Sequence, residues 1–537
     1  MIDPSLTLFG LFAFASAKPL STRSNATNTT TVWSFAEVAS SASLQWTPCF
    51  ENFSCANLEV PLDYTKPDVG TINVAFLKKE ALQQPAMGDI LINPGGPGVS
   101  GIDYVLQGSV ILERLLGTAY NIVGFDPRGV NNSGPHLDCF QGSPAIRDYY
   151  DSTYYSDVDL KCLSSMSKHF QAAGAFGDWC SRSLSHEANY ANTPATARDM
   201  LQYIKVLAES RGESPNDAKL NYYGVSYGST LGITYAALFP DHVGRMIIDG
   251  VVDAEDYYSG AWKQNLVQAD EAVQGFFESC YQAGPSCAFF RNDSSAKDIE
   301  RRANAILKDI EENPISVADP AFVDFPTVIT GQDVRGALLL SLYSAISGFP
   351  LIASMLSGLE ARNGSIMIPL LEAVQPRLLI ACNDANGRYN ISTVGKWHDY
   401  VRDLEMVSTY VGEVWATVII LQCRSLQFTP PANQLFYGFN TTITSHPILF
   451  TANRIDPVTS SGDKMSKLFP GSVVLKQDTI GHGLQVAQSD CISRSLQKFL
   501  ECGELPPENT MCDTEVHPFQ AGVKTKRIPQ YPRGLGI

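Results

Sequence analysis

A serine between two glycines offers the most direct chemistry in this sequence. Ser226 stands in the stretch 224–228 (GVSYG), which fits the pattern G-x-S-x-G. A strand pattern at 220–223 precedes it and a helical pattern through 239 follows it. A strand–turn–helix context of this kind exposes the serine hydroxyl, and the glycines allow the tight turn. The context predicts that Ser226 is a nucleophile; the alternative is a passive serine in a glycine-rich turn.

A serine hydroxyl needs a neighbouring base that takes its proton and a carboxylate that orients this base. Among the eight histidines, His482 lies in a Gly-His-Gly loop after a late strand and before an amphipathic helix. Asp456 follows the strand pattern 447–450 by a short turn. Because both positions follow successive strands, we predict that Asp456 orients His482 and that His482 activates Ser226. His446 is the nearest rival for the base, but it begins a strand rather than ending one.

The tetrahedral intermediate of acyl transfer needs two backbone N–H donors for its oxyanion. The residue after the nucleophile, Tyr227, is expected to supply one of them. The second is expected from the loop 93–98 (NPGGPG), which exposes its backbone at the end of an early strand. We favour Gly96 for this donor, and Gly95 is the alternative.

The elements that must position these residues alternate between strands and helices in the first half of the chain. Strands are predicted at 71–78, 89–93, 120–125, 220–223 and 246–249. One helix is predicted at 102–116, and another begins with Thr193 as its cap and Pro194 as its first helical residue. Residues 136–190 show no clear periodicity and are expected to form an irregular insertion. The alternation predicts an α/β fold with a mostly parallel sheet that is covered on both faces.

Helical periodicity replaces this alternation from about residue 255 to 435, and the strand pattern then resumes at 447–450 and 473–475. We therefore expect one sheet-containing core that is interrupted by a large helical cap. The predicted boundaries are 1–17 for a signal peptide, 18–57 for an N-terminal segment, 58–254 and 436–515 for the two parts of the core, 255–435 for the cap, and 516–537 for a tail.

Composition excludes several classes of protein. The 537 residues carry 39 Lys and Arg against 55 Asp and Glu, a formal charge of −16. A nucleic-acid-binding protein needs a basic face that neutralises phosphates, so this balance argues against such a function. Beyond the extreme N-terminus no apolar run is long enough for a stable membrane span. No Cys or His cluster has zinc-ligand spacing, and neither a metal nor an organic cofactor is predicted.

The N-terminus and the cysteines indicate the secretory pathway. Residues 6–17 form a short apolar run that ends in Ala-Ser-Ala, as signal peptides do, although Asp3 replaces the usual basic residue before it. Several of the twelve cysteines are expected to form disulfides. Those that lie near one another in the sequence are Cys49 and Cys55, Cys280 and Cys287, and the C-terminal Cys491, Cys502 and Cys512.

Asn-x-Ser/Thr sequons are spread over the chain and agree with secretion. The asparagines predicted to carry glycans are Asn25, Asn28, Asn52, Asn292, Asn363, Asn390 and Asn440. A further sequon, at Asn131, lies near the predicted active edge, where a glycan would hinder access, so we expect it to be unused. The predicted location is extracellular, with the vacuole or another secretory compartment as the alternative.

Five motifs in a fixed order carry a family resemblance: NPGGPGVSG (93–101), GFDPRGV (124–130), GVSYGS (224–229), ANRIDPVT (452–459) and GHG (481–483). Together they resemble the proline iminopeptidase and tripeptidyl aminopeptidase group of α/β-hydrolases. The cysteine-containing stretch 491–519 is similar to the secreted tripeptidyl-aminopeptidase-like branch. The resemblance covers about 58–510. It implies an α/β-hydrolase core, a helical cap over the site, and a serine exopeptidase that releases residues from free N-termini.

The chain departs from this group at two places. Proline iminopeptidases proper carry a histidine where this chain has Asn93, which favours the tripeptidyl branch. The stretch 129–133 (GVNNS) replaces the Gly-x-Gly-x-Ser expected after Asp-x-Arg-Gly. Asp126 and Arg128 are expected to orient the loop rather than to take part in catalysis. The carboxylates available in the cap to bind a substrate ammonium group are Asp333, Glu360, Glu372 and Asp384, and the sequence does not choose among them.

The sequence therefore predicts a secreted serine hydrolase. The favoured hypothesis is an aminopeptidase that releases tripeptides or N-terminal residues through an acyl-enzyme and tolerates proline. An esterase or lactonase acting on a peptide-like or secondary-metabolite substrate is the alternative, because the same triad cleaves esters. A binding protein without catalysis on the same scaffold is a third hypothesis. The expected partner is a peptide or a small-molecule acyl substrate, and the oligomeric state stays open.

Overall fold

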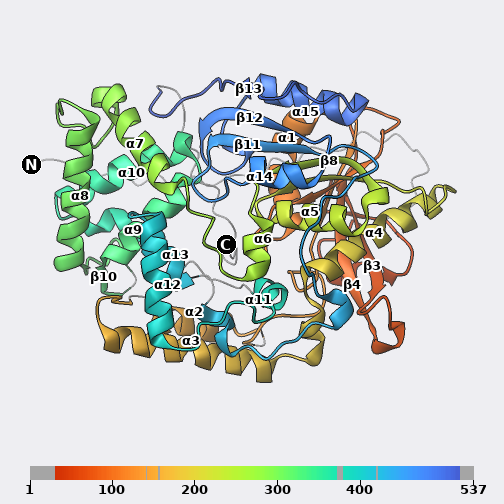
Figure 1. The fold of residues 1–537 in the computed structure, drawn as a ribbon, viewed down its shortest axis with the longest axis horizontal. Helices are drawn as coiled ribbons and strands as arrows, with labels where there is room; N and C mark the ends of the chain where they lie inside the picture. Colours follow the sequence, from red (N-terminus) through yellow and green to blue (C-terminus); the bar gives the residue numbers. More distant parts are fainter. Residues whose placement is uncertain are drawn as a thin grey trace, which may run out of the picture.

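The computed structural model describes residues 31–140, 142–154, 158–323, 325–371, 379–418 and 421–520. Its centre is an 11-stranded sheet with the order β1-β3-β4-β6-β5-β7-β8-β11-β12-β13, and β2 pairs with β3 beside this path (Figure 1). The strands are β1 (Ser40–Ser41), β2 (Thr47–Cys49), β3 (Phe53–Pro61), β4 (Thr71–Lys79), β5 (Asp89–Asn93), β6 (Asn121–Phe125), β7 (Leu220–Val225), β8 (Val243–Asp249), β11 (Leu449–Ile455), β12 (Val473–Ile480) and β13 (Met511–Cys512).

Most of the sheet is parallel. β3 pairs antiparallel with β4, and β4 with β6, whereas each neighbouring pair from β6 through β13 runs parallel. Every residue of β5 and of β6 is buried. Strands that are covered on both faces need continuous apolar sequence, which is why the pattern 89–93 predicts a central strand. The predicted fold class is confirmed.

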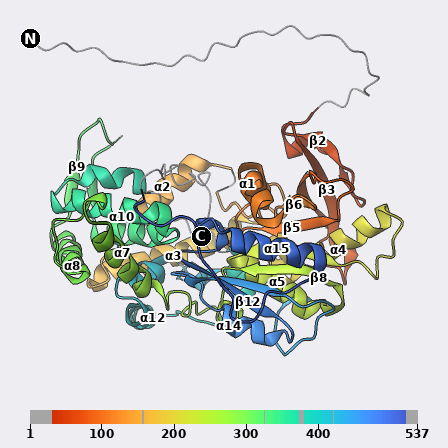
Figure 2. The same ribbon diagram turned by 90° about the horizontal axis from the view of Figure 1, so that it is seen from above.

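Helices cover both faces of the sheet (Figure 2). α1 (Gly101–Leu116) and α15 (Asp490–Cys502) pack together on one face, and α4 (Thr193–Ser210) and α5 (Tyr227–Leu238) pack on the other. Side chains of a strand alternate between the two layers. In β5, Ile90 and Ile92 join the core beneath α1 and α15, and Leu91 joins the core beneath α4 and α5.

The chain leaves the sheet after β8 and returns at β11. The intervening residues 254–434, called the helical insertion below, lie beside the sheet in Figure 1. They contain α6 (Ala254–Ser259), α7 (Ala269–Ala283), α8 (Ala296–Glu312), β9 (Ile315–Val317), β10 (Thr327–Ile329), α9 (Gly331–Leu342), α10 (Ala345–Glu360), α11 (Leu379–Ala385), α12 (Val394–Val407) and α13 (Gly412–Val418). Strands β9 and β10 form a separate two-stranded sheet.

The prediction that residues 136–190 form an irregular insertion is wrong. This segment contains α2 (Pro144–Tyr154) and the 21-residue α3 (Leu163–Ser183). The buried face of α3 includes Met166, Phe170 and Ala173 at helical spacing, and the helix packs on the short helix η7 (Leu421–Ser425). Small and polar residues between these positions weaken the pattern, so the helix depends on a partner that is far away in the sequence.

The start of α4 also differs from the prediction. Asn192, not Thr193, is the N-cap, and its side-chain oxygen accepts a hydrogen bond from Ala195 N. Pro194 lies in the first turn as expected. The hydroxyl of Thr193 instead interacts with Tyr227 and Asp384, which lie near the end of β7 and in α11.

Ten of the twelve cysteines form disulfides, as the sequence predicts for several of them. The pairs are Cys49–Cys55, Cys139–Cys180, Cys280–Cys287, Cys382–Cys423 and Cys491–Cys512. Cys162 and Cys502 are free. Two of these bonds hold distant segments of the chain: Cys139–Cys180 connects α3 to the loop before α2, and Cys382–Cys423 connects α11 to η7.

Candidate active site

Ser226 occupies the turn between β7 and α5. Its backbone has φ 59° and ψ −126°, a strained conformation for a residue with a side chain. A Cβ on Gly224 would lie 2.4 Å from Gly228 O, and one on Gly228 would lie 2.4 Å from Asn93 O. Only glycine fits at both positions, and the turn has the strand–turn–helix form that exposes a nucleophile.

His482 and Asp456 lie on the loops that follow β12 and β11. Nδ1 of His482 is 3.0 Å from Oδ2 and 3.2 Å from Oδ1 of Asp456. The hydroxyl of Thr459 lies 3.0 Å from the same nitrogen. Asp456 Oδ1 accepts hydrogen bonds from the backbone N–H groups of Val458 and Thr459. The turn after Asp456 therefore fixes its carboxylate in a position that orients the imidazole.

Both members of this pair are buried, with side-chain exposures of 7% for His482 and 1% for Asp456. Burial lowers the pKa of His482, but the charge and hydrogen bond of Asp456 and the charge of Asp249 outweigh it, so the net pKa is raised. Nε2 of His482 is buried and has no hydrogen-bond partner among the described residues. This nitrogen is therefore available to a proton from a nucleophile.

Two backbone approaches bring the histidine loop to the nucleophile turn. Ser226 N donates to Asp249 O at 3.1 Å. The next residue, Gly250, lies against His482, since a Cβ there would be 3.1 Å from His482 Cε1. A Cβ on Gly483 would similarly be 3.1 Å from the side chain of Val225. The carboxyl ends of β7, β11 and β12 thus gather the three predicted residues at one edge of the sheet.

The rival histidine lies elsewhere. Nδ1 of His446 is 2.9 Å from Val243 O, which is at the beginning of β8, whereas Asp249 ends that strand beside the nucleophile turn. The seven-residue strand separates the two positions. His446 is therefore at the opposite edge of the sheet from Ser226.

The loop after β5 lies directly against the nucleophile turn. A Cβ on Gly95 would be 2.7 Å from Ser226 Cβ and 3.1 Å from Tyr227 N. Gly95 N donates to Asn93 Oδ1, whereas no hydrogen bond is recorded for the N–H of Gly96 within the described residues. Tyr227 is the first residue of α5, so its N–H has no partner inside the helix. This pattern favours Gly96 over Gly95 as the second oxyanion donor.

Asp126 and Arg128 hold loops in place, as expected. The carboxylate of Asp126 accepts hydrogen bonds from Ser100 Oγ, at the start of α1, and from Asn132. Burial raises the pKa of Asp126 to about 6. Arg128 is fully buried and forms an ion pair with Asp199.

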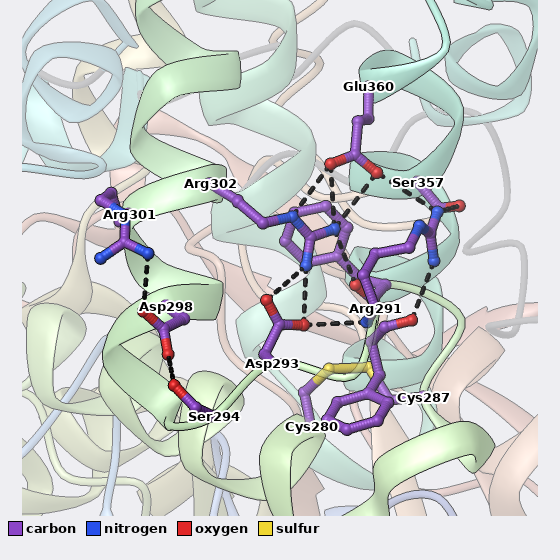
Figure 3. Close-up of polar contacts among 12 residues, drawn as sticks. Cys280, Cys287, Arg291, Asp293, Ser294, Asp298, Arg301, Arg302, Ser357 and Glu360 are labelled. Atoms are coloured by element: carbon purple, nitrogen blue, oxygen red, sulfur yellow. Dashed lines mark hydrogen bonds and ion pairs between the residues drawn. A yellow bond between two sulfur atoms is a disulfide. The ribbon is translucent and has the colours of Figure 1, made fainter.

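The three described candidates for an ammonium-binding carboxylate have partners already. Asp333 caps α9 through reciprocal bonds with Thr330. Glu360 forms ion pairs with Arg291 and Arg302 in a cluster beside the Cys280–Cys287 disulfide (Figure 3). Asp384 is buried and accepts hydrogen bonds from Thr193 and Tyr257. Glu372 lies outside the described residues.

The helical insertion contacts all three loops that carry the predicted residues. Gln268, the N-cap of α7, accepts a hydrogen bond from Asp456 N through its side-chain oxygen at 3.0 Å. The carbonyl of Tyr343, at the end of α9, accepts one from His482 N at 2.9 Å. Asp384 reaches Tyr227 through the hydroxyl of Thr193.

Sequence reasoning missed these residues. Gln268 and Tyr343 belong to helices that are distant in the sequence, so no local pattern marks them. One feature of the sequence could have identified Asp249: it is an acidic residue at the end of a buried strand, and this strand lies next to the strand of the nucleophile.

Within the described ranges, no group of three or more His, Cys, Asp or Glu is arranged to hold a metal ion. In the same ranges, no helix combines the length and the apolar character needed to cross a membrane.

A family model described as the alpha/beta hydrolase fold matches residues 90–486. The chain belongs to this family. Its relatives include the tripeptidyl aminopeptidase of Streptomyces lividans, which is 26% identical over 514 residues that cover 89% of this chain and 88% of that protein. The serine protease Hip1 of Mycobacterium tuberculosis is 26% identical over 371 residues, covering 65% of this chain and 64% of that protein.

A third relative is named as an esterase and not as a peptidase. Carboxylesterase B of Mycobacterium tuberculosis is 25% identical over 479 residues, covering 85% of this chain and 86% of that protein. The resemblance to the tripeptidyl aminopeptidase group that the motifs carry is confirmed by the first two relatives. The protein is an α/β-hydrolase, and its relatives include a tripeptidyl aminopeptidase, a serine protease and a carboxylesterase.

Proposed function

We propose that this protein is a secreted serine aminopeptidase in which Ser226 is the nucleophile, His482 the general base, and Asp456 the residue that orients it. The observation that carries the proposal is the hydrogen-bonded pair of His482 and Asp456 beside a serine held at positive φ between β7 and α5. The similarity to a tripeptidyl aminopeptidase supports a peptide as the substrate.

The reaction proceeds through an acyl-enzyme. Ser226 Oγ bonds to the substrate carbonyl carbon while its proton moves to Nε2 of His482. The carbonyl oxygen becomes an oxyanion, which the N–H groups of Gly96 and Tyr227 stabilise. Collapse of the intermediate breaks the C–N bond, and the leaving amine takes the proton from His482. In the second half of the reaction, His482 takes a proton from a water molecule, whose oxygen bonds to the acyl carbon. The bond to Ser226 Oγ then breaks, this oxygen takes the proton back from His482, and the N-terminal fragment leaves as the acid.

The first test replaces the nucleophile and the base. Ser226→Ala abolishes labelling by a fluorophosphonate probe, and both Ser226→Ala and His482→Ala lower the hydrolysis of peptide anilides by at least about 1,000-fold, because the remaining site lacks the activated hydroxyl. His446→Ala is the matched control and keeps wild-type turnover. Wild-type labelling of Ser226→Ala would show that another residue is the nucleophile.

The second test concerns the substrate. The proposed enzyme releases tripeptides or N-terminal residues and accepts proline at the scissile position, so it cleaves Ala-Ala-Pro anilides with a free amino group and not their N-acylated forms. The similarity to carboxylesterase B favours a second candidate, an esterase or lactonase with the same triad. Equal rates on free and blocked anilides, together with faster cleavage of simple esters, would replace the first function by the second.

We also propose that the enzyme is secreted and glycosylated. Five disulfides are typical of an oxidising compartment. The described asparagines predicted to carry glycans are all exposed: Asn52, Asn292, Asn363, Asn390 and Asn440. The remaining two, Asn25 and Asn28, and the predicted signal peptide lie outside the described residues. Recovery from a eukaryotic culture medium, with a fall in mass on treatment with an N-glycosidase, is the expected result; an unglycosylated intracellular product would contradict it.

A further inference from the structure

A second buried carboxyl group lies beside the candidate triad and has no part in the mechanism described above. Asp249 is the last residue of β8 and is 0% exposed. Its backbone oxygen accepts the hydrogen bond from Ser226 N, and it immediately precedes Gly250, which lies against the imidazole of His482. Asp249 therefore lies between the nucleophile turn and the histidine loop.

The side chain of Asp249 is held as a hydrogen-bond acceptor. Oδ2 accepts from the backbone N–H of Leu484 at 2.9 Å and from the hydroxyl of Tyr223 at 2.8 Å. Oδ1 accepts from the hydroxyl of Thr451 at 2.9 Å. All three partners serve as donors to the carboxyl group. Burial raises the pKa of Asp249, and these three hydrogen bonds together with the charge of His482 oppose that shift, because an ionised carboxylate only accepts hydrogen bonds.

Two side chains from the sheet together hold the loop around His482. Asn453 Nδ2 donates to the carbonyl oxygens of Gly481 and Gly483, at 2.7 and 2.9 Å. Asp249 accepts from the N–H of Leu484, one residue further on. A Cβ on Gly483 would be 3.4 Å from Asp249 Oδ2, so the loop passes directly over the carboxylate. The backbone on both sides of His482 is thereby tied to β8 and β11.

Few charged or polar side chains surround His482 and Asp249. The polar and aromatic side chains that face His482 are Asp456 and Thr459 from the loop after β11, Tyr343 from the end of α9, and Asp249 from β8. Those that face Asp249 are Tyr223 of β7, Thr451 of β11 and His482. The negative charges of Asp456 and Asp249 act on His482 in the same direction, and both raise its pKa.

We propose that Asp249 is a positioning residue of this active site: its buried carboxylate holds the loop of His482 against the nucleophile turn and stabilises the protonated imidazole that forms when Ser226 attacks. The proposal rests on the proposed role of Ser226, Asp456 and His482 and adds a second carboxylate behind the histidine. It does not depend on the substrate, because every acyl transfer at this site passes through the protonated imidazole.

The test measures the rate of fluorophosphonate labelling against pH, because this probe reacts whether the enzyme prefers peptides or esters. Labelling needs neutral His482, so the rate falls as the pH drops through the pKa of this group. Asp249→Asn keeps the size of the side chain and removes its charge. We expect the acid limb of the profile to move to lower pH and the maximal rate to fall about 10- to 100-fold as the loop loses its position.

Asp89→Asn is the matched control. Asp89 is also a buried aspartate that accepts hydrogen bonds from a tyrosine and an asparagine, but it begins β5 at the opposite edge of the sheet. We expect the acid limb of the labelling rate of Asp89→Asn to coincide with that of the wild type. A folded Asp249→Asn variant with a wild-type rate and an unmoved acid limb would overturn the proposal.

Two further variants decide the question if Asp249→Asn does not fold. Tyr223→Phe and Thr451→Val each remove one donor to the carboxylate and leave its charge and the loop sequence unchanged. Both are expected to lower kcat for the best substrate while KM changes little, and wild-type kcat in both would overturn the proposal. A wild-type enzyme that is not labelled at all would instead contradict the proposed function, so the two failures are distinguishable.

Discussion

At the scale of the residue, two glycines decide how closely the loop after β5 approaches the nucleophile turn. Gly95 and Gly96 both have positive φ, 112° and 103°. A Cβ on Gly95 would collide with Ser226 and approach the N–H of Tyr227, whereas a Cβ on Gly96 would meet the following backbone N–H groups of its own loop. Because Gly95 packs so closely, the next residue, Gly96, follows directly on the contact with the turn that carries Tyr227, the other proposed oxyanion donor.

Gly95→Ala therefore removes activity. Its Cβ would lie 2.7 Å from both Ser226 Cβ and Val225 O, and the backbone there is in a region that disfavours side chains. We expect kcat of the folded variant to fall by about 100-fold or more. Gly108→Ala is the control, since nothing lies within 4 Å of a Cβ there. It lies inside α1 and should stabilise the protein by about 0.5–1 kcal/mol without changing kcat. Full activity of Gly95→Ala would contradict the proposed oxyanion loop.

The electrostatics of His482 predict how activity depends on pH. Its pKa is raised, chiefly because the carboxylate of Asp456 outweighs the effect of burial. The base must be neutral to accept the proton of Ser226, so kcat/KM falls as the pH drops through a value above the ordinary pKa of about 6.5. Initial rates from pH 4 to 9 at constant ionic strength measure this limb. A midpoint below 6 would show that the two carboxylates do not dominate.

At the scale of the element, the helical insertion takes part in building the site. Its side chains and backbone reach the loop of Asp456 from α7, the loop of His482 from α9, and Tyr227 from α11. The backbone of Ser344 also forms an isolated antiparallel bridge with Gly481. These contacts mean that moving α7 and α9 away from the sheet would disturb the candidate residues themselves.

Gln268→Ala tests this coupling between elements. The variant removes the acceptor for Asp456 N, so the turn that orients the carboxylate loses one of its supports. We expect an about 10-fold fall in kcat with little change in KM, because the substrate does not have to touch Gln268 for the triad to lose alignment. Gln264→Ala is the control, as this exposed residue lies four positions earlier. Equal kcat in both variants would show that α7 does not position Asp456.

At the scale of the whole molecule, the charge of −16 coexists with several acidic side chains inside the fold. Burial is the main cause that raises the pKa of Asp126, Asp256 and Asp384, each to about 6. The folded protein therefore binds protons between pH 4 and 6 that the unfolded chain has already released. Lowering the pH through this range favours the folded state, and it also reduces the repulsion among surface carboxylates.

We therefore expect the thermal midpoint to be higher at pH 5 than at pH 8. The sign follows from the raised values: the stabilisation by each carboxyl group is lost as the pH rises through about 6, and the raised pKa of His482 acts in the same direction above it. Differential scanning calorimetry in buffers of equal ionic strength measures the effect. Asp256→Asn should reduce the difference between the two midpoints, and a midpoint that rises toward pH 8 would contradict the prediction.

The sequence by itself determined what depends on short stretches of chain. About twenty consecutive residues, with the pattern of a strand, a glycine turn and a helix, predict the turn at Ser226. Continuous apolar side chains predict fully buried strands such as 89–93. Asp456 and His482 were identified because each follows a strand closely, and parallel strands end at one edge of the sheet. For this reason the fold class was predictable, and so was the location of Ser226, Asp456 and His482 after strands that end at the same edge of the sheet.

Only the tertiary structure decided the contacts between distant segments. Asp456 and Gln268 are 188 positions apart, and Asp384 and Thr193 are 191 apart. Helix α3 was missed because its stability comes from packing on η7 and from a disulfide rather than from a strong local pattern. The position of Asp249 behind His482 follows from the order of the strands in the sheet. Hydrogen bonds and burial depend on distance in space and not on distance along the chain. Residues that support a site from another element therefore do not belong to any periodic sequence pattern around that site.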